Sequence, residues 1–245
     1  MAKAMQPSGE GRVKIIGGLI VGLIVVGIIG SAVLARRDKA GVDSSAALPP
    51  SVQADFGVPF PGTPNAGAPE VSIYEDFQCP ACGSLEAVAG ENIRQLAESG
   101  KIALTWYPVA FLDDNPSVRQ ANRDNDNPDS SKRAIAAWGC AIDQGKTADF
   151  HDALFSVQPE EGRGYSTQTL KGLSAVTGMS QDQATAYEAC VDDQTYIGWA
   201  RNATIAFRNT SIGGTPSVFV NGEQIDNGDV ADQAKFAALI DAATK

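Results

Sequence analysis

The sequence contains few residues that bind metals or haem, and this scarcity limits the metal and haem sites that the protein could form. It has 4 cysteines and 1 histidine among 245 residues. A structural zinc site usually takes its four ligands from two close pairs, but only Cys79 and Cys82 lie close together. A c-type haem needs a histidine directly after the second cysteine, and Gly83 occupies that position. We therefore predict no metal and no organic cofactor.

Basic residues are also scarce. The chain has 19 lysines and arginines against 29 aspartates and glutamates, which gives a formal net charge of −10. Nucleic acids are bound mainly through clustered positive charge on the protein surface. The acidic balance therefore disfavours nucleic acid as a partner, and it is otherwise typical of a solvated surface.

The most informative motif is Cys79-Pro80-Ala81-Cys82, which follows the alternating segment Val71–Tyr74. A helical pattern begins directly after the first cysteine, so Cys79 is predicted at a helix N-terminus. There the unpaired backbone N–H groups and the helix dipole favour negative charge, and the thiolate is the reactive form of cysteine. Cys82 lies one turn further on, within reach of a disulfide. A purely structural bond is the alternative, but so short a loop would constrain the unfolded chain little.

The segment Ile15–Leu34 carries no charge and is rich in isoleucine, valine, leucine and glycine. At about 1.5 Å per residue it would span roughly 30 Å of hydrocarbon. Its length favours an uncleaved membrane anchor, with residues 1–14 in the cytoplasm, over a signal peptide cleaved after Ala32 or Ala35. Basic residues flank the run equally, so they do not set its orientation. Because paired cysteines persist in oxidising compartments, we expect the large C-terminal part outside the cytoplasmic membrane.

The rest of the chain divides into a tether and a folded part. Residues 35–69 are rich in proline and lack a regular pattern, which predicts an extended tether. The folded part begins with a strand, a helix and a strand, an order typical of parallel pairing; they are predicted at residues 71–74, 80–99 and 102–107.

Further helical patterns follow, at residues 131–142, 147–157, 166–177, 181–191 and 196–209. Asn221-Gly222 is a strong hairpin signal between two short strands, Ser217–Val220 and Glu223–Ile225. A last helix is predicted over residues 230–242.

The order of elements matches an α/β thioredoxin fold with an inserted all-helical domain. Two motifs carry a closer resemblance, Asp76–Cys82 and Gly213–Val220. On these motifs the chain resembles the DsbA-like thiol-disulfide oxidoreductases of the thioredoxin superfamily, in the membrane-anchored form found in actinobacteria. Residues 70–111 and 195–245 would form the thioredoxin-like domain, and residues 112–194 the helical insertion.

The resemblance implies roles for particular residues. Cys79 would be the exchanging nucleophile and Cys82 its buried partner. The second motif of this family contains a cis proline beside the cysteines, so Thr215 and Pro216 are expected to bind an extended substrate. The implied substrates are reduced exported proteins. The implied reoxidant is a membrane protein, either DsbB-like or similar to vitamin K epoxide reductase, and the expected state is a monomer.

Two positions depart from the family pattern. Many strong oxidases of this family carry a histidine between the cysteines, where this chain has Ala81. Stabilisation of the Cys79 thiolate is therefore left to the helix N–H groups and dipole. Relatives often have a buried carboxylate six residues before the first cysteine, where this chain has Ile73. Glu75 or Asp76 could substitute, but the preferred interpretation makes both solvated residues at the strand end.

The remaining candidate residues are interpreted as structural. Cys140 and Cys190 fall on two different helices of the insertion, which favours a structural disulfide between them. A second redox pair is the alternative. His151 lies in a helical pattern and is interpreted as a structural residue bonded to a neighbour.

The sequence leaves two alternatives to an oxidase of exported proteins. One is a reductase or isomerase of the same fold, although isomerases of this group usually carry an N-terminal dimerisation domain, for which residues 35–69 are too short. The other is a tethered peptide-binding module with a structural C-x-x-C bond and no enzymatic activity.

Overall fold

A computed structural model describes residues 41–245 of the chain. The cytoplasmic segment predicted at residues 1–14 and the span predicted at residues 15–34 lie outside the described residues. Among the residues that are described, no helix has both the length and the apolar character needed to span a bilayer. The folded unit runs from Asp43 to Lys245.

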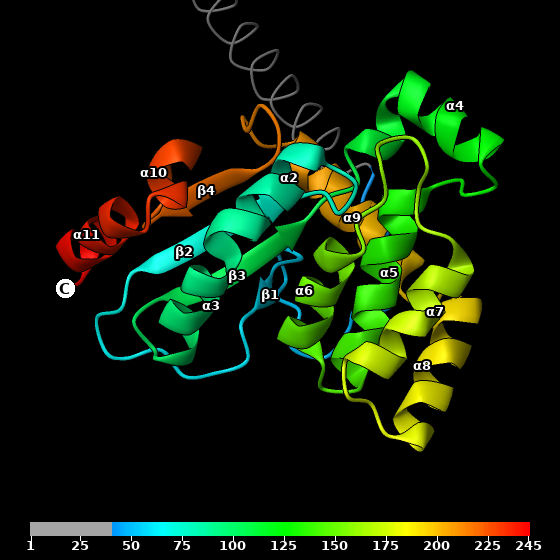
Figure 1. Cartoon of the computed structure of the whole chain (residues 1–245), viewed down its shortest axis with the longest axis horizontal. Coiled ribbons are helices and arrows are strands. Elements are labelled where there is room, and N and C mark those ends of the chain that lie inside the picture. The colour runs from blue at the N-terminus through cyan, green and yellow to red at the C-terminus, as the bar shows by residue number, and fades with distance from the viewer. Residues whose placement is uncertain (1–40) are drawn as a thin grey trace, which may run out of the picture. The chain divides into compact units, whose positions relative to one another are not determined.

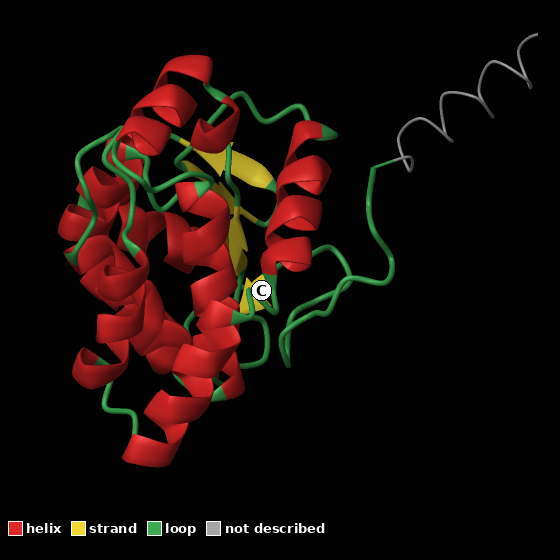
Figure 2. Ribbon diagram, turned by 90° about the vertical axis from the view of Figure 1, so that its right-hand side faces the viewer, coloured by secondary structure: helices red, strands yellow, loops and turns green. Residues whose placement is uncertain are grey.

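A five-stranded sheet lies at the centre of this folded unit, between helices on both of its sides (Figures 1 and 2). β2 and β3 are parallel, with Ile73 opposite Trp106, whereas β4 runs antiparallel to β2. The order across the sheet is β1-β3-β2-β4-β5, formed by Val58–Pro59, Ala103–Pro108, Glu70–Glu75, Ser217–Val220 and Glu223–Ile225. The hairpin predicted between β4 and β5 is confirmed: Asn221 and Gly222 have φ angles of 49° and 82°.

The connection from β2 to β3 places the two close cysteines. β2 is followed by α2 (Pro80–Leu85), a π-helical turn η1 (Glu86–Gly90) and α3 (Glu91–Glu98). Proline is favoured at the first helical position because the missing N–H would have no partner there. Gly100, with a φ of 71°, follows the helix end in the left-handed conformation that glycine tolerates best. The single helix predicted over residues 80–99 is thus confirmed, apart from the π-helical turn.

The central strands place alternate side chains on two faces of the sheet. One face buries Ile73 and Trp106 against the main core. The opposite face carries Tyr74, and α9 (Ile197–Arg208) covers it through Phe207, whose ring centroid lies 6.0 Å from that of Tyr74. Glu75 continues the alternation of the first face and therefore points into the protein.

Residues 112–194 contribute helices and loops to the fold. α5 is the central helix of this block and packs against α6, α8 and α9. Ser180 and Gln183 form a capping box at the start of α8. The elements are η2 (a 3-10 helix), α4, α5, α6, α7 and α8, at Leu112–Asp114, Pro116–Asp124, Ser130–Asp143, Thr147–Ser156, Thr167–Val176 and Gln181–Asp192.

The prediction of an extended tether is wrong over residues 43–69, because these residues belong to the folded unit. Val58 is fully buried and pairs with Trp106, so this segment supplies the edge strand β1. The N–H of Asn65 also donates to the carbonyl of Gly100 at 2.9 Å. The segment therefore covers the edge of β3, whose backbone groups would otherwise be unpaired.

The last helix was predicted as one element and is two. α10 covers Asn227–Ala231 and α11 covers Gln233–Ala243. Asp232 separates them, because its side chain accepts hydrogen bonds from the N–H groups of Ala234 and Lys235 at 3.1 Å each. Aspartate is among the preferred residues for capping a helix N-terminus in this way.

The predicted pairing of Cys140 and Cys190 is present. Their disulfide joins α5 to α8, with the Cα atoms 5.8 Å apart and the two residues separated by 50 positions in the sequence. Cys140 is fully buried. The bond therefore ties the central helix of the helical block to its last helix.

Replacing both Cys140 and Cys190 with alanine should lower the free energy of unfolding by about 2–4 kcal/mol, because the unfolded chain regains the entropy of a long closed loop. Urea unfolding of the wild type and the double variant measures this difference. Wild type treated with reductant should unfold at the same urea concentration as the variant. Equal stability of the oxidised wild type and the variant would contradict a structural role for the bond.

Candidate functional site

Cys79 is the N-cap residue of α2, as predicted. Its backbone is extended, with φ −73° and ψ 118°, and Pro80 begins the helix. Cys79 is 9% exposed as a whole residue, whereas Cys82 is fully buried, and both are free thiols in the structure. An incoming thiol therefore reaches the sulfur of Cys79 and not that of Cys82.

The two thiols have opposite acid–base properties. The pKa of Cys79 falls to about 6, chiefly because the Cys82 thiol donates a hydrogen bond to its sulfur, with the N–H groups of Cys82 and Ala81 adding to this effect against the cost of burial. Burial raises the pKa of Cys82 strongly, and its hydrogen bond to Cys79 and the negative charge of Glu75 act in the same direction. Cys79 is therefore the thiol that ionises, whereas Cys82 retains its proton.

In the reduced protein, iodoacetamide should alkylate Cys79 with a rate that is half-maximal near pH 6. Cys82 should stay unmodified up to at least about pH 9, because its thiolate is not formed there. Peptide mapping by mass spectrometry at each pH measures both rates separately. Equal alkylation of the two cysteines across this pH range would refute the assignment.

The loop before β4 lies beside Cys79. The peptide bond between Thr215 and Pro216 is cis, as the resemblance implied. The Thr215 carbonyl lies 3.5 Å from the Cys79 sulfur. The Asn227 side chain holds the loop by donating to the Pro216 carbonyl at 3.1 Å. Thr215 and Pro216 are thus brought together with the cysteines.

The interpretation of Glu75 and Asp76 as solvated residues is wrong. Their exposed fractions are 3% and 0%. Glu75 follows the alternation of Val71 and Ile73 and therefore lies on the buried face of β2. Asp76 accepts a hydrogen bond from the N–H of Leu112 at 2.8 Å. Burial outweighs such bonds and raises the pKa of Asp76 to about 7.

A buried polar network joins the cysteine motif to the helical block. The Ser131 hydroxyl donates to Asp76 at 2.6 Å, and the Gln78 amide donates to the same hydroxyl at 2.6 Å. The Asn122 amide in turn donates to the Gln78 side-chain oxygen at 3.0 Å. Helices α4 and α5 thereby fix the two residues that lead into Cys79.

Sequence reasoning missed Gln158 and Tyr165. The Gln158 amide donates to the carbonyls of Phe77 and Cys79 at 2.9 Å each. The Tyr165 hydroxyl donates to the Phe77 carbonyl at 3.0 Å. Gln158 lies in the loop after α6 and Tyr165 in the segment before α7, and both hold the backbone around Cys79. No motif in the sequence identifies either residue.

Gly83 leaves the space that Gln158 occupies, since a β-carbon at Gly83 would overlap the Gln158 side-chain oxygen. Gly83→Ala should therefore displace the Gln158 amide and lower the free energy of unfolding by about 1–2 kcal/mol through the lost hydrogen bonds. In a Gln158→Ala background the same change should instead stabilise by about 0.5–1 kcal/mol, because alanine is the better helix former.

A double-mutant cycle from urea unfolding of these variants measures this coupling. If the effect of Gly83→Ala is the same in both backgrounds, Gln158 does not hold this position.

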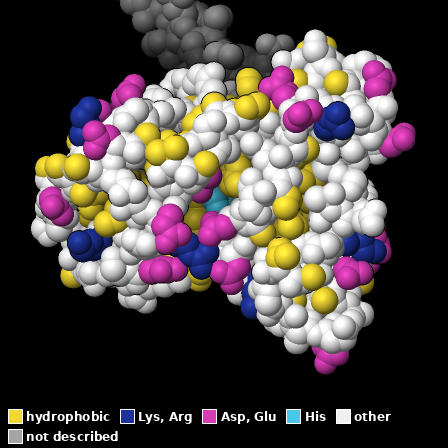
Figure 3. Space-filling view, viewed as in Figure 1, with side chains coloured by type: hydrophobic (Ala, Val, Ile, Leu, Met, Phe, Trp, Pro, Cys, Tyr) yellow, Lys and Arg dark blue, Asp and Glu magenta, His cyan; other side chains and the backbone are white. Residues whose placement is uncertain are grey.

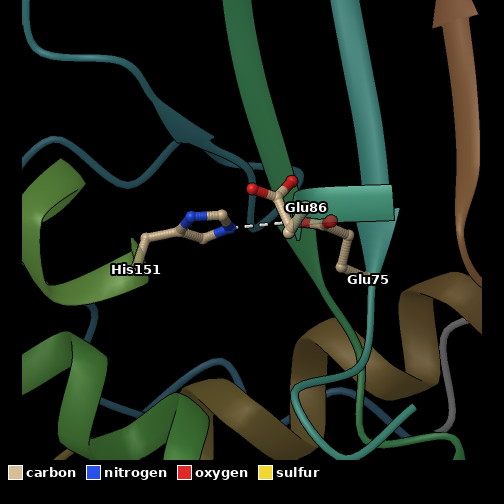
Figure 4. A group of neighbouring side chains, drawn as sticks. All are labelled: Glu75, Glu86 and His151. Carbon is tan, nitrogen blue, oxygen red and sulfur yellow. Dashed lines mark hydrogen bonds and ion pairs between the residues drawn. The ribbon is translucent and has the colours of Figure 1, made fainter. Parts of the chain in front are cut away.

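His151 is buried, as a structural helix histidine would be, and its neighbours are acidic. It is 1% exposed, and its Nε2 lies 3.0 Å from the Glu75 carboxylate. Burial lowers the pKa of His151, but hydrogen bonds to Asp152 and Glu75 and the charge of Glu86 together raise it to about 10. Figure 4 shows Glu75, Glu86 and His151 converging from different elements; these are the described residues best placed to hold a cation.

Comparisons with known proteins agree with this geometry. A family model described as thioredoxin matches residues 59–242. The thiol-disulfide oxidoreductase MdbA from Actinomyces oris has a similar structure, with a TM-score of 0.66 at 22% identity, covering 83% of this chain and 96% of that chain. Among curated proteins, no match to the chain was found.

Two mycobacterial structures are also similar. The disulfide bond oxidoreductase DsbG from Mycobacterium tuberculosis is 28% identical, with a TM-score of 0.54, over 82% of this chain and 89% of that chain. DsbA from the same organism is 26% identical, with a TM-score of 0.53, over 83% of this chain and 97% of that chain. The similarity thus extends over nearly the whole of the described structure.

Proposed function

The chain belongs to the thioredoxin family as a DsbA-like thiol-disulfide oxidoreductase, and we propose that it introduces disulfide bonds into exported proteins by exchange through Cys79 and Cys82. The observation that carries this proposal is the contrast between the two thiols. Cys79 is the accessible thiol with a pKa of about 6, and Cys82 is buried and keeps its proton.

The reaction proceeds in two exchanges. A substrate thiolate attacks the Cys79 sulfur of the Cys79–Cys82 disulfide, that bond breaks, and Cys82 leaves and takes up a proton. A second substrate thiolate then attacks the substrate sulfur of the mixed disulfide, and Cys79 leaves as a thiolate. The substrate loses two electrons and the enzyme gains them. A leaving thiol of low pKa departs faster, which suits Cys79 to the second step.

The surroundings of Cys79 suit an extended substrate. The Thr215 carbonyl, 3.5 Å from the Cys79 sulfur, offers a backbone acceptor for a short strand-like pairing. Leu112, Val118 and Phe155 pack around the two cysteines, and Phe111 exposes 42% of its surface next to them in sequence. An unfolded polypeptide presents both free backbone groups and apolar side chains to such a surface.

The low pKa of Cys79 also supports the oxidative direction. A stable thiolate stabilises the reduced enzyme, so the disulfide form becomes a stronger oxidant. A reduction potential of about −120 to −180 mV is expected for an oxidase or isomerase. A value near −270 mV would instead indicate a reductase, and one below about −300 mV a structural bond.

We place the catalytic part outside the cytoplasmic membrane, as a monomer tethered through residues 15–34. The uncharged run in the sequence and the disulfide between Cys140 and Cys190 support this location. A membrane protein, DsbB-like or similar to vitamin K epoxide reductase, would reoxidise the cysteine pair.

Cys79→Ser should abolish oxidation of a reduced, unfolded test protein, because the exchanging sulfur is gone. Cys82→Ser cannot form the internal disulfide and should also fail to oxidise the reduced protein, but its Cys79 thiolate should attack a disulfide-bonded test protein and form a mixed disulfide, with the other substrate sulfur leaving as a thiolate. The matched control replaces both Cys140 and Cys190 with alanine and should retain most of the wild-type rate. Thiol loss followed by a chromogenic reagent, with gels run without reductant, measures these outcomes. Full activity of Cys79→Ser, or loss of activity in the folded control, would refute the assignment.

A further inference from the structure

Three side chains from three elements meet beneath the cysteine motif. Glu75 lies at the end of β2, Glu86 begins η1, and His151 belongs to α6. One oxygen or nitrogen atom from each lies within 4.8 Å of the other two. The Glu75 oxygen and the His151 Nε2 are 3.0 Å apart. Two atoms bound to one tetrahedral ion at bond lengths of about 2.0 Å are separated by about 3.3 Å, so small side-chain shifts would bring all three onto one ion.

The second nitrogen of His151 is held as in many metal sites. Its Nδ1 lies 3.3 Å from the Asp152 carboxylate, and Trp106 stacks on the ring with centroids 4.5 Å apart. A metal-bound histidine almost always donates its other N–H to such a carboxylate, which fixes the ring and its tautomer. With the proton on Nδ1, the lone pair of Nε2 faces the Glu75 carboxylate. Two acceptors can face each other at this distance only if a cation or a proton lies between them.

Unpartnered oxygens point to a ligand at the same place. Among the described residues, the Oε1 atoms of Glu75 and Glu86 are buried and have no hydrogen-bond partner. Glu75 is 3% exposed as a whole residue. A buried carboxylate oxygen without a partner is costly, and structures normally satisfy such atoms with a donor or a cation. Both oxygens belong to the same cluster as the His151 Nε2.

Glu86, one of the three residues of the cluster, lines a pocket that is open to solvent. This pocket of about 280 Å³ is lined by Glu86, Glu91 and Asp152 together with Gly83, Gly90 and Phe155. Figure 3 shows the histidine side chain, the only one in the sequence, in a hollow bordered by acidic side chains. This acidic border attracts cations, and the pocket has room for water as a further ligand.

We propose that Glu75, Glu86 and His151 bind one divalent transition-metal ion, for which Zn²⁺ is the best fit. Two carboxylates and an imidazole match the oxygen and nitrogen ligands that zinc accepts, and water from the pocket completes a tetrahedron. The imidazole disfavours Mg²⁺ and Ca²⁺, which prefer oxygen ligands throughout. The charge of a divalent ion balances the two carboxylates and leaves His151 neutral. This site uses no cysteine, so it differs from the cysteine-based zinc site that the sequence argues against.

The test uses the full-length protein in detergent, oxidised so that Cys79 and Cys82 form a disulfide and offer no thiol to the metal. Calorimetric titration with Zn²⁺ should show one bound ion per chain. Glu86→Gln should weaken this binding by at least about tenfold, because one ligand charge is lost. The matched control is Glu91→Gln, which removes the same charge from the same pocket and should leave the affinity unchanged within about twofold.

Zinc X-ray absorption on the oxidised wild type gives a readout that needs no variant. It should show nitrogen and oxygen ligands at about 2.0–2.2 Å, one imidazole among them, and no sulfur. The proposal is overturned if the oxidised protein binds no Zn²⁺, if the spectrum lacks imidazole or contains sulfur, or if Glu86→Gln and Glu91→Gln weaken binding equally. Absence of binding would mean that a proton alone occupies the gap between His151 and Glu75.

Discussion

The protonation states of the two active-site thiols depend on the hydrogen bond between Cys79 and Cys82, and the rest of the structure holds these two residues in place. This hydrogen bond stabilises a thiolate on Cys79 and keeps the proton on Cys82. It can form because both residues lie in the first turn of α2, where backbone N–H groups also face the sulfur. Without a histidine at Ala81, this chain obtains the low pKa of Cys79 from its partner thiol and its backbone.

Holding that first turn requires buried polar groups, which are costly unless they are partnered. Asp76 and Gln78 are completely or almost completely buried just before Cys79, and the network through Ser131 and Asn122 supplies their partners. Most of these partners come from the helical block and not from the thioredoxin-like part. The inserted helices therefore form part of the active-site framework, in addition to covering it.

The same helical block also contacts Glu75, the other buried acidic residue at the end of β2. Glu75 and Asp76 are neighbours in sequence and point to different sides of the cysteine motif. Asp76 bonds to the backbone that leads into η2, whereas Glu75 meets His151 of α6. Glu75 also contributes to the raised pKa of Cys82. A cation at the cluster of Glu75, Glu86 and His151 would therefore offset this contribution of Glu75 to the pKa of Cys82.

Features that depend on near neighbours in the chain could be predicted from the sequence. These are the helix start at Cys79, the capping box at Ser180, the turn at Asn221-Gly222 and the strand–helix–strand order, because each follows from local backbone preferences. Three features emerge only in the folded chain: the burial of Glu75 and Asp76, the contact of Gln158 with the backbone of Cys79, and the pairing of Val58 in β1. Each of these depends on groups far away in the sequence, and a local pattern holds no information about which distant donor satisfies a buried acceptor.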